Sequence, residues 1–204
     1  MTNGPTTAAG DRLSVRDLIT IGMLSLLLVI LMSVIMTVVF LVPVLFPFGM
    51  AFVAIPGGVI GMLLLARVAK PGVILIWGAT LAVMMVALGF GAIPPIALLV
   101  AALVGELLYN RLGRHNFGGM AVGYGSLIVG IAVGSNLIFA FSPGVGLADA
   151  AARGNDPGAL AAMMRFISPG MLPVIGAVAF GGAWLGAMLG RRLLRKHFER
   201  AGKV

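Results

Sequence analysis

The sequence predicts an all-α membrane protein, in which a bundle of about six transmembrane helices forms one integral membrane domain over residues 1–204. Hydrophobic residues make up 60% of the chain and charged residues 10%, and the mean hydropathy is +1.13. A soluble domain carries about 25% charged residues, so this chain has too little polar surface to face water on all sides. Its apolar runs approach the roughly 20 residues that a helix needs to cross a hydrocarbon core of about 30 Å.

The predicted spans form a bundle over residues 18–190, which follows a polar N-terminal segment, residues 1–17. The six spans are expected at residues 18–42, 50–66, 71–90, 96–109, 120–141 and 169–190. Their ends are set by clusters of proline, glycine and charged residues, which interrupt or terminate helices.

The first three spans are each bounded by one of these signals. Span 1 is too long for a signal-peptide core, so we expect it to be retained. Pro43 and Pro47 interrupt the chain after it, and span 2 ends before Arg67. Span 3 is expected to start at Pro71, because proline suits the first position of a helix.

The last three spans are separated by two polar connections. A glycine- and proline-rich turn over residues 89–95 precedes span 4, and a basic segment separates spans 4 and 5. Residues 142–168 form one long polar connection between spans 5 and 6, in which two stretches are able to form short helices. Residues 191–204 form a basic tail.

The positions of the cations predict the orientation of the bundle. Of the 14 Lys and Arg residues, all but Arg153 and Arg165 fall on one side of an even number of spans. The residues on that side are Arg12, Arg16, Arg67, Lys70, Arg111, Arg114, Arg191, Arg192, Arg195, Lys196, Arg200 and Lys203. Cytoplasmic loops carry the excess of Lys and Arg, so both termini are predicted in the cytoplasm. The external segments are then residues 43–49, 89–95 and 142–168.

The composition argues against catalysis, a cofactor and a nucleic-acid partner. There is no cysteine, and both histidines, His115 and His197, lie in basic segments predicted to be cytoplasmic. No Walker motif is present, so the chain is not expected to hydrolyse ATP by itself. The net charge of +8 is explained by membrane topology, which leaves the lipid bilayer rather than nucleic acid as the partner of the basic segments.

Small residues recur at a spacing of four in several spans, which allows helices to approach closely in lipid. Gly182 and Gly186 belong to the longest such series, in span 6, and Gly22 and Ser25 are small residues of span 1. Packing inside the bundle is one explanation. The other is a docking face for a second membrane subunit, and these four residues are its candidates.

Several further residues have two competing explanations. Glu106 is the ionisable residue well inside a span. We expect it to reach the interface or to pair with Arg111 or Arg114, and a proton-relay role is the alternative. Trp77, Tyr124 and Trp184 are expected in an aromatic belt at the membrane interface.

Asn136 is the polar residue that we favour for ligand contact. An unpaired amide is costly in lipid, so its side chain must face protein or a cavity. A hydrogen bond between helices is the competing explanation. The external side also carries Phe139, Phe46 and Phe48, and Met164 offers a soft apolar wall. The predicted substrate site therefore comprises these five residues, between span 5, span 6 and the external loops.

Parts of the chain resemble a known family. Ser168–Ile175 (SPGMLPVI), Leu189–Val204 (LGRRLLRKHFERAGKV), Val15–Gly22 and Gly134–Asn136 are similar to the corresponding segments of the MptD/Trep_Strep family. That family is described as substrate-binding (S) components of energy-coupling factor (ECF) transporters. The similarity extends over essentially the whole chain, with six spans in the same places. Span 1 lacks the A-x-x-x-A pattern that many S components carry.

The resemblance implies a function in uptake. An S component binds a small vitamin-like molecule from outside and associates with a membrane T subunit and two cytoplasmic ATPases. It also implies contacts with substrate through Asn136 and the external loops. A self-sufficient secondary carrier or channel is the alternative.

Overall fold

The computed structural model describes residues 13–152, 154 and 156–200, and these residues form helices, turns and no β-strand. The α-helices are α1 Val15–Val39, α2 Gly49–Arg67, α3 Val73–Ala87, α4 Ile93–Leu112, α5 Phe117–Phe141, α6 Pro143–Ala152, α7 Pro157–Met164 and α8 Leu172–Arg200. Two short 3₁₀ helices, η1 Pro43–Phe48 and η2 Pro169–Met171, precede α2 and α8.

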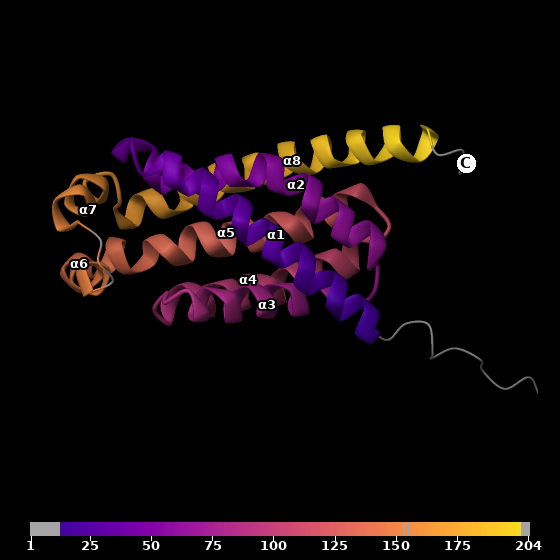
Figure 1. Cartoon of the computed structure of the whole chain (residues 1–204), viewed down its shortest axis with the longest axis horizontal. Helices are drawn as coiled ribbons and strands as arrows, with labels where there is room; N and C mark the ends of the chain where they lie inside the picture. The colour runs from indigo at the N-terminus through magenta and orange to yellow at the C-terminus, as the bar shows by residue number, and fades with distance from the viewer. Residues whose placement is uncertain (1–12, 153, 155, 201–204) are drawn as a thin grey trace, which may run out of the picture.

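The long helices run between two ends of the molecule (Figure 1). The start of α1 and the last turns of α8 lie at one end, which we call the basic end because Arg16 lies in the first turn of α1 and Lys70 pairs there with Asp17. The short helices α6 and α7 lie at the opposite end, which we call the α6–α7 end. A chain that crosses the bundle an even number of times starts and ends on the same side. The cation pattern predicts such an even number, and the start of α1 and the end of α8 lie at the same end.

Five described helices are long and apolar enough to cross a membrane: α1, α2 with η1, α4, α5, and α8 with η2. The third predicted span, residues 71–90, is shorter than expected, because α3 has 15 residues, about 22 Å at 1.5 Å per residue. Gly72 and Gly89 flank α3 with φ angles of 85° and 83°, which glycine adopts readily. Pro71 therefore lies before the helix and does not start it.

Other boundaries differ from the predictions for reasons of local chemistry. α4 begins at Ile93, earlier than predicted, because Pro94 and Pro95 fit the first turn of a helix. The predicted basic tail continues α8 as far as Arg200. The long connection between α5 and α8 contains the two expected short helices, α6 and α7. Arg153 and Asn155 of this connection lie outside the described residues.

The start of α1 is held at the basic end by polar contacts. Ser14 and Asp17 form a capping box, in which the Asp17 carboxylate accepts from the backbone N–H of Ser14 at 2.7 Å. Lys70, in the connection between α2 and α3, donates to the same carboxylate at 2.6 Å. The N-terminus of α1 is thereby tied to the connection between two other helices.

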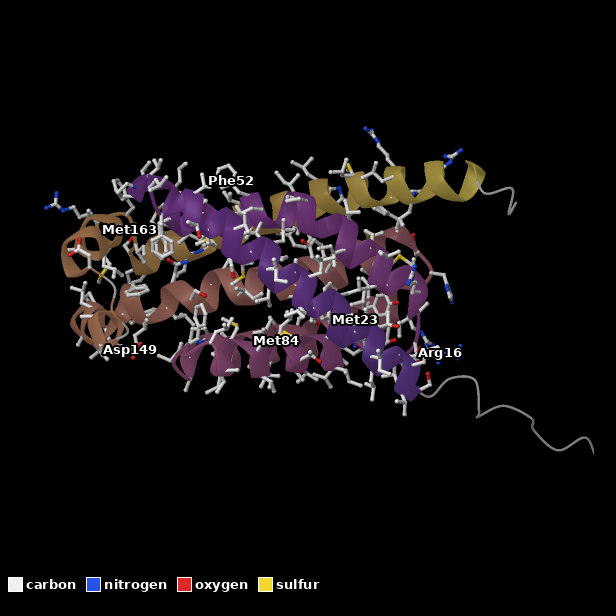
Figure 2. The ribbon with its side chains drawn as sticks, in the orientation of Figure 1. Arg16, Met23, Phe52, Met84, Asp149 and Met163 are labelled. Carbon is white, nitrogen blue, oxygen red and sulfur yellow. The ribbon has the colours of Figure 1, made fainter. Side chains whose placement is uncertain are left out.

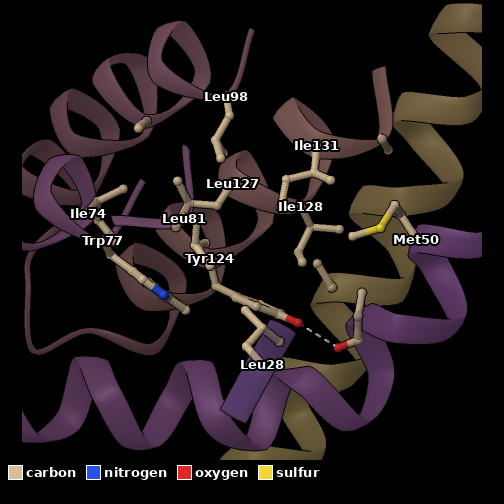
Figure 3. Packing of buried hydrophobic residues seen from close by; sticks show 14 of the residues in the cluster. Leu28, Met50, Ile74, Trp77, Leu81, Leu98, Tyr124, Leu127, Ile128 and Ile131 are labelled. Carbon is tan, nitrogen blue, oxygen red and sulfur yellow. Dashed lines mark hydrogen bonds between the residues drawn. The ribbon is translucent and has the colours of Figure 1, made fainter. Parts of the chain in front are cut away.

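Two of the predicted interface aromatics lie in the centre of the bundle (Figure 3). Trp77 and Tyr124 are both 0% exposed and stack with ring centroids 6.0 Å apart. The Tyr124 hydroxyl donates to the carbonyl oxygen of Ala54 in α2 at 2.9 Å. The aromatic-belt prediction is therefore wrong for these two residues. Trp184 is half-buried and packs edge-on against Phe117, with ring centroids 5.5 Å apart.

The glycines of α8 pack against α2 inside the chain. A Cβ atom added to Gly186 would lie 2.2 Å from the Ala54 carbonyl oxygen, and one added to Gly182 would lie 2.7 Å from the Ala51 carbonyl oxygen. Gly58 of α2 faces Gly186 in the same way. Because α2 covers Gly182 and Gly186, these two residues are not open to a second subunit.

Glu106 binds α3 and not an arginine in the described structure. Its Oε1 accepts from the backbone N–H of Gly72 at 2.6 Å and from Asn110 Nδ2 at 2.6 Å. Its Oε2 accepts from the backbone N–H groups of Ile74 at 2.9 Å and Leu75 at 3.4 Å. The first N–H groups of a helix lack partners within the helix, so this carboxylate of α4 caps α3.

Candidate functional site

A cavity of about 480 Å³ lies toward the α6–α7 end of the bundle. Its walls come from α1, η1, the starts of α2 and α4, the turn between α3 and α4, α5, and the short helices α6 and α7. Figure 2 shows Asp149 of α6 and Met163 of α7 at this end, opposite Arg16. The volume falls within the roughly 300–1,000 Å³ that is typical of small-molecule pockets.

Asn136 supplies a buried polar group to this cavity. Its side chain is 5% exposed, and its Nδ2 donates to the Ala132 carbonyl oxygen one turn earlier in α5 at 2.8 Å. Its Oδ1 has no hydrogen-bond partner. A buried polar atom left without a partner costs about 1–3 kcal/mol. The free oxygen is thus an acceptor available to a ligand that donates an N–H or O–H.

Much of the cavity wall is aromatic and thioether in character. Phe46 of η1 and Phe139 of α5 line it, and the Phe40 ring lies 5.1 Å from the Phe46 ring, centroid to centroid. Met36 of α1 and Met50 of α2 add polarizable side chains. α6 approaches Phe139 closely, since a Cβ atom added to Gly146 would lie 2.6 Å from that ring.

The structure brings three of the five predicted site residues together and separates the other two. Asn136, Phe139 and Phe46 line the cavity described above. Phe48 lines a different hollow of about 360 Å³, together with Arg165 and Phe166. Met164 lines neither of these two spaces.

The cavity also has a different wall from the predicted one. Among the described side chains, none from α8 lines it, whereas Met32, Ser33, Met36 and Thr37 of α1 do. The glycines of α8 hold that helix against α2, which leaves α1 beside the cavity. Ser33 and Thr37 lie four residues apart on one face of a mostly apolar helix, a signal that the sequence contains.

The comparison with protein families identifies the group to which the chain belongs. A family model described as a hypothetical bacterial integral membrane protein, Trep_Strep, matches residues 15–200. The chain is a member of the Trep_Strep family. With its five long apolar helices, it is a multi-pass integral membrane protein. No curated protein matches it, and no solved structure matches it.

The docking candidates of this Trep_Strep protein differ in what surrounds them. Gly22 is half-buried, and a Cβ atom added to it would meet nothing within 4 Å. Ser25, three residues later, is 0% exposed. Of the four candidates, Gly22 therefore has open space beside it, while Ser25, Gly182 and Gly186 are covered.

The ionisable groups of the family member do not form a metal site in the described part of the chain. No group of three or more His, Cys, Asp or Glu side chains lies together among the described residues. His115 is exposed in the connection before α5. The side chain of His197 lies outside the described residues. Asp149 is the carboxylate that lines the cavity.

Proposed function

We propose that this Trep_Strep protein is the substrate-binding (S) component of an ECF importer. It captures a small molecule in the cavity toward the α6–α7 end and delivers it with a T subunit and two ATPases. The observation that carries this proposal is the 480 Å³ cavity, into which a buried amide presents an oxygen that lacks a partner. The resemblance to S components supplies the partners.

The cavity has the features of a binding site and not of a packing defect. Empty cavities in proteins are lined by apolar groups, whereas a binding site adds a few placed polar atoms to an apolar wall. Here Asn136 and Asp149 are placed among phenylalanines and methionines. The short helices α6 and α7 form part of the wall and are positioned as a lid, the element that closes over a ligand in many proteins.

The position of the buried carboxylate of Glu106 supports the proposal that partner ATPases, and not a coupled ion, supply the energy for uptake. A self-sufficient carrier couples uptake to an ion, through ionisable groups buried within its membrane spans near the substrate site. Glu106 is the buried ionisable residue of the described spans, and it binds four donors where α3 begins. That position is at the basic end, whereas the cavity is toward the opposite end. Glu106 therefore has a structural task away from the substrate.

The T subunit is expected to dock on α1 around Gly22. This helix exposes a row of large apolar side chains, among them Met23 at 69% and Val34 at 62%. α1 packs on α2, α3 and η1. The resemblance to S components supplies the T subunit as the partner of this exposed face.

Two measurements test the proposed function. The tagged chain, co-expressed with T and ATPase subunits, should copurify with them, and Gly22→Leu should weaken this association without loss of folded protein. Gly181→Leu provides a matched control, because Gly181 also faces open space but lies on α8. The second measurement uses a ligand that mass spectrometry identifies in the purified protein, and follows its uptake into liposomes. Uphill uptake of that ligand by this chain alone in ATP-free liposomes would identify a secondary carrier and contradict the proposal.

A further inference from the structure

We infer that the cavity takes a flat aromatic molecule that donates an N–H hydrogen bond to Asn136 Oδ1. The inference deepens the proposed function, since it rests on this cavity being the substrate site. It follows from which atom of Asn136 lacks a partner, from the aromatic ring next to that residue, and from what the rest of the wall offers to a ligand.

The first step concerns the side-chain amide of Asn136. Its Nδ2 donates to the Ala132 carbonyl oxygen at 2.8 Å, and only the NH₂ side of an amide can donate to a carbonyl. The atom without a partner is therefore the oxygen, in a side chain that is 5% exposed. A buried acceptor without a partner is costly, so the ligand group that reaches this oxygen must donate a hydrogen.

The second step concerns the aromatic ring beside this oxygen. Phe139 follows Asn136 by three residues in α5, and residues at that spacing are neighbours on the surface of a helix. Both residues line the cavity. The short helix α6 packs on the Phe139 ring, since a Cβ atom added to Gly146 would lie 2.6 Å from it. A ligand that donates to Asn136 therefore has an aromatic side chain next to its donor group.

The third step concerns the walls around these two residues. The rings of Phe40 and Phe46 have centroids 5.1 Å apart, and both line the cavity. Thioethers come from Met32, Met36 and Met50. Aromatic and thioether groups pack favourably against other aromatic rings. A body rich in hydroxyl or amide groups would leave those groups without partners against this surface, whereas a flat aromatic body matches it.

The fourth step concerns the other polar groups of the wall. Asp149 already interacts within the chain, and no Lys, Arg or His is among the described residues that line the cavity. Ser33 Oγ and Thr37 Oγ1 each donate their one proton to a carbonyl oxygen of α1, at 2.9 and 2.8 Å. Asn136 is the buried polar residue of the described wall. Recognition therefore depends on the hydrogen bond to Asn136 and on apolar packing, and not on an ion pair.

The test compares three bicyclic probes of nearly the same size on the full chain in nanodiscs. Indole donates an N–H, benzofuran has an oxygen at that position, and 1-methylindole carries a methyl group there. Affinities are measured by NMR titration, with empty nanodiscs as the blank for partition into lipid. We expect indole to bind about ten-fold more tightly than the other two, because both leave Asn136 Oδ1 without a donor.

The variants show whether Asn136 causes the preference. Asn136→Leu should lower the affinity for indole to that for benzofuran, and should leave benzofuran binding unchanged or tighter. Ser126→Ala is the matched control, because its hydroxyl also donates to a carbonyl oxygen of α5 but does not line the cavity, so the preference should remain. Gel filtration shows whether each variant is folded. The comparison of the three probes on the unmodified chain decides the inference should Asn136→Leu fold poorly.

Three results would overturn the inference. They are benzofuran binding as tightly as indole, no binding of indole at millimolar concentration, and a preference for indole that folded Asn136→Leu retains. None of these measurements uses the T subunit or the ATPases. Failure of the chain to copurify with those subunits would therefore refute the importer and leave the preference for an N–H donor standing, and the reverse also holds.

Discussion

Replacement of Glu106 by glutamine should destabilise the protein through the start of α3. The carboxylate is 7% exposed and accepts from four donors, three of them backbone N–H groups of Gly72, Ile74 and Leu75. Glutamine keeps one oxygen and replaces the other with an NH₂ group, which has no acceptor to meet at those distances. In the Glu106→Gln variant, the side-chain NH₂ group would therefore point at a backbone N–H group of α3, and neither can accept a hydrogen bond from the other.

The size of the effect follows from the number and kind of bonds lost. At least one charge-assisted hydrogen bond disappears and leaves its buried N–H unsatisfied, which together costs about 1–3 kcal/mol. The negative charge at the helix N-terminus is also lost, at about 0.3–1 kcal/mol. We expect the free energy of unfolding to fall by about 1–4 kcal/mol, and the melting temperature to fall by about 3–15 °C.

The assay is thermal unfolding of the purified protein in detergent, with hydrogen exchange to locate the change. Exchange should accelerate first at the amides of Ile74 and Leu75. Asn110→Ala is the control, because it removes the fourth donor and leaves the carboxylate with its three backbone partners. Its effect should be smaller than that of Glu106→Gln. Unchanged melting together with lost transport would refute the capping role and favour a proton relay.

Three further predictions concern the ligand, the packing of α8 and the topology. Asn136→Leu should weaken binding of the copurifying ligand by about ten-fold or more at unchanged expression, and normal affinity would remove Asn136 from the site. Gly186→Val should reduce the yield of monodisperse protein, because its side chain would meet the Ala54 carbonyl oxygen, whereas Gly181→Val meets open space and should be tolerated. A cysteine placed at Asn155 should react with an impermeant reagent in intact cells and one at Val204 should not, and protection of Asn155 would contradict the orientation.

Much of the candidate site was accessible from the sequence. Asn136 is a buried amide in an apolar span, and Phe46 and Phe139 occur at the same predicted end, so their shared cavity follows from topology. Asp149 and the pair Ser33 and Thr37 were missed. Asp149 lies in a connection whose path depends on tertiary packing. The hydroxyls of Ser33 and Thr37 can be assigned to the site only when the structure shows that α1 forms a wall of the cavity.

The sequence by itself determined the membrane class, the approximate spans and their predicted orientation. These properties depend on local hydropathy and on where cations interrupt it, and neither needs a long-range contact. The tertiary structure decided which face of each helix points inward. It buried Trp77 and Tyr124, joined Gly186 to α2, and directed Glu106 to the start of α3. The physical reason is that lipid and protein interior are both apolar. Side chains facing either one have the same hydrophobicity, so the pattern that separates surface from core in water is missing here.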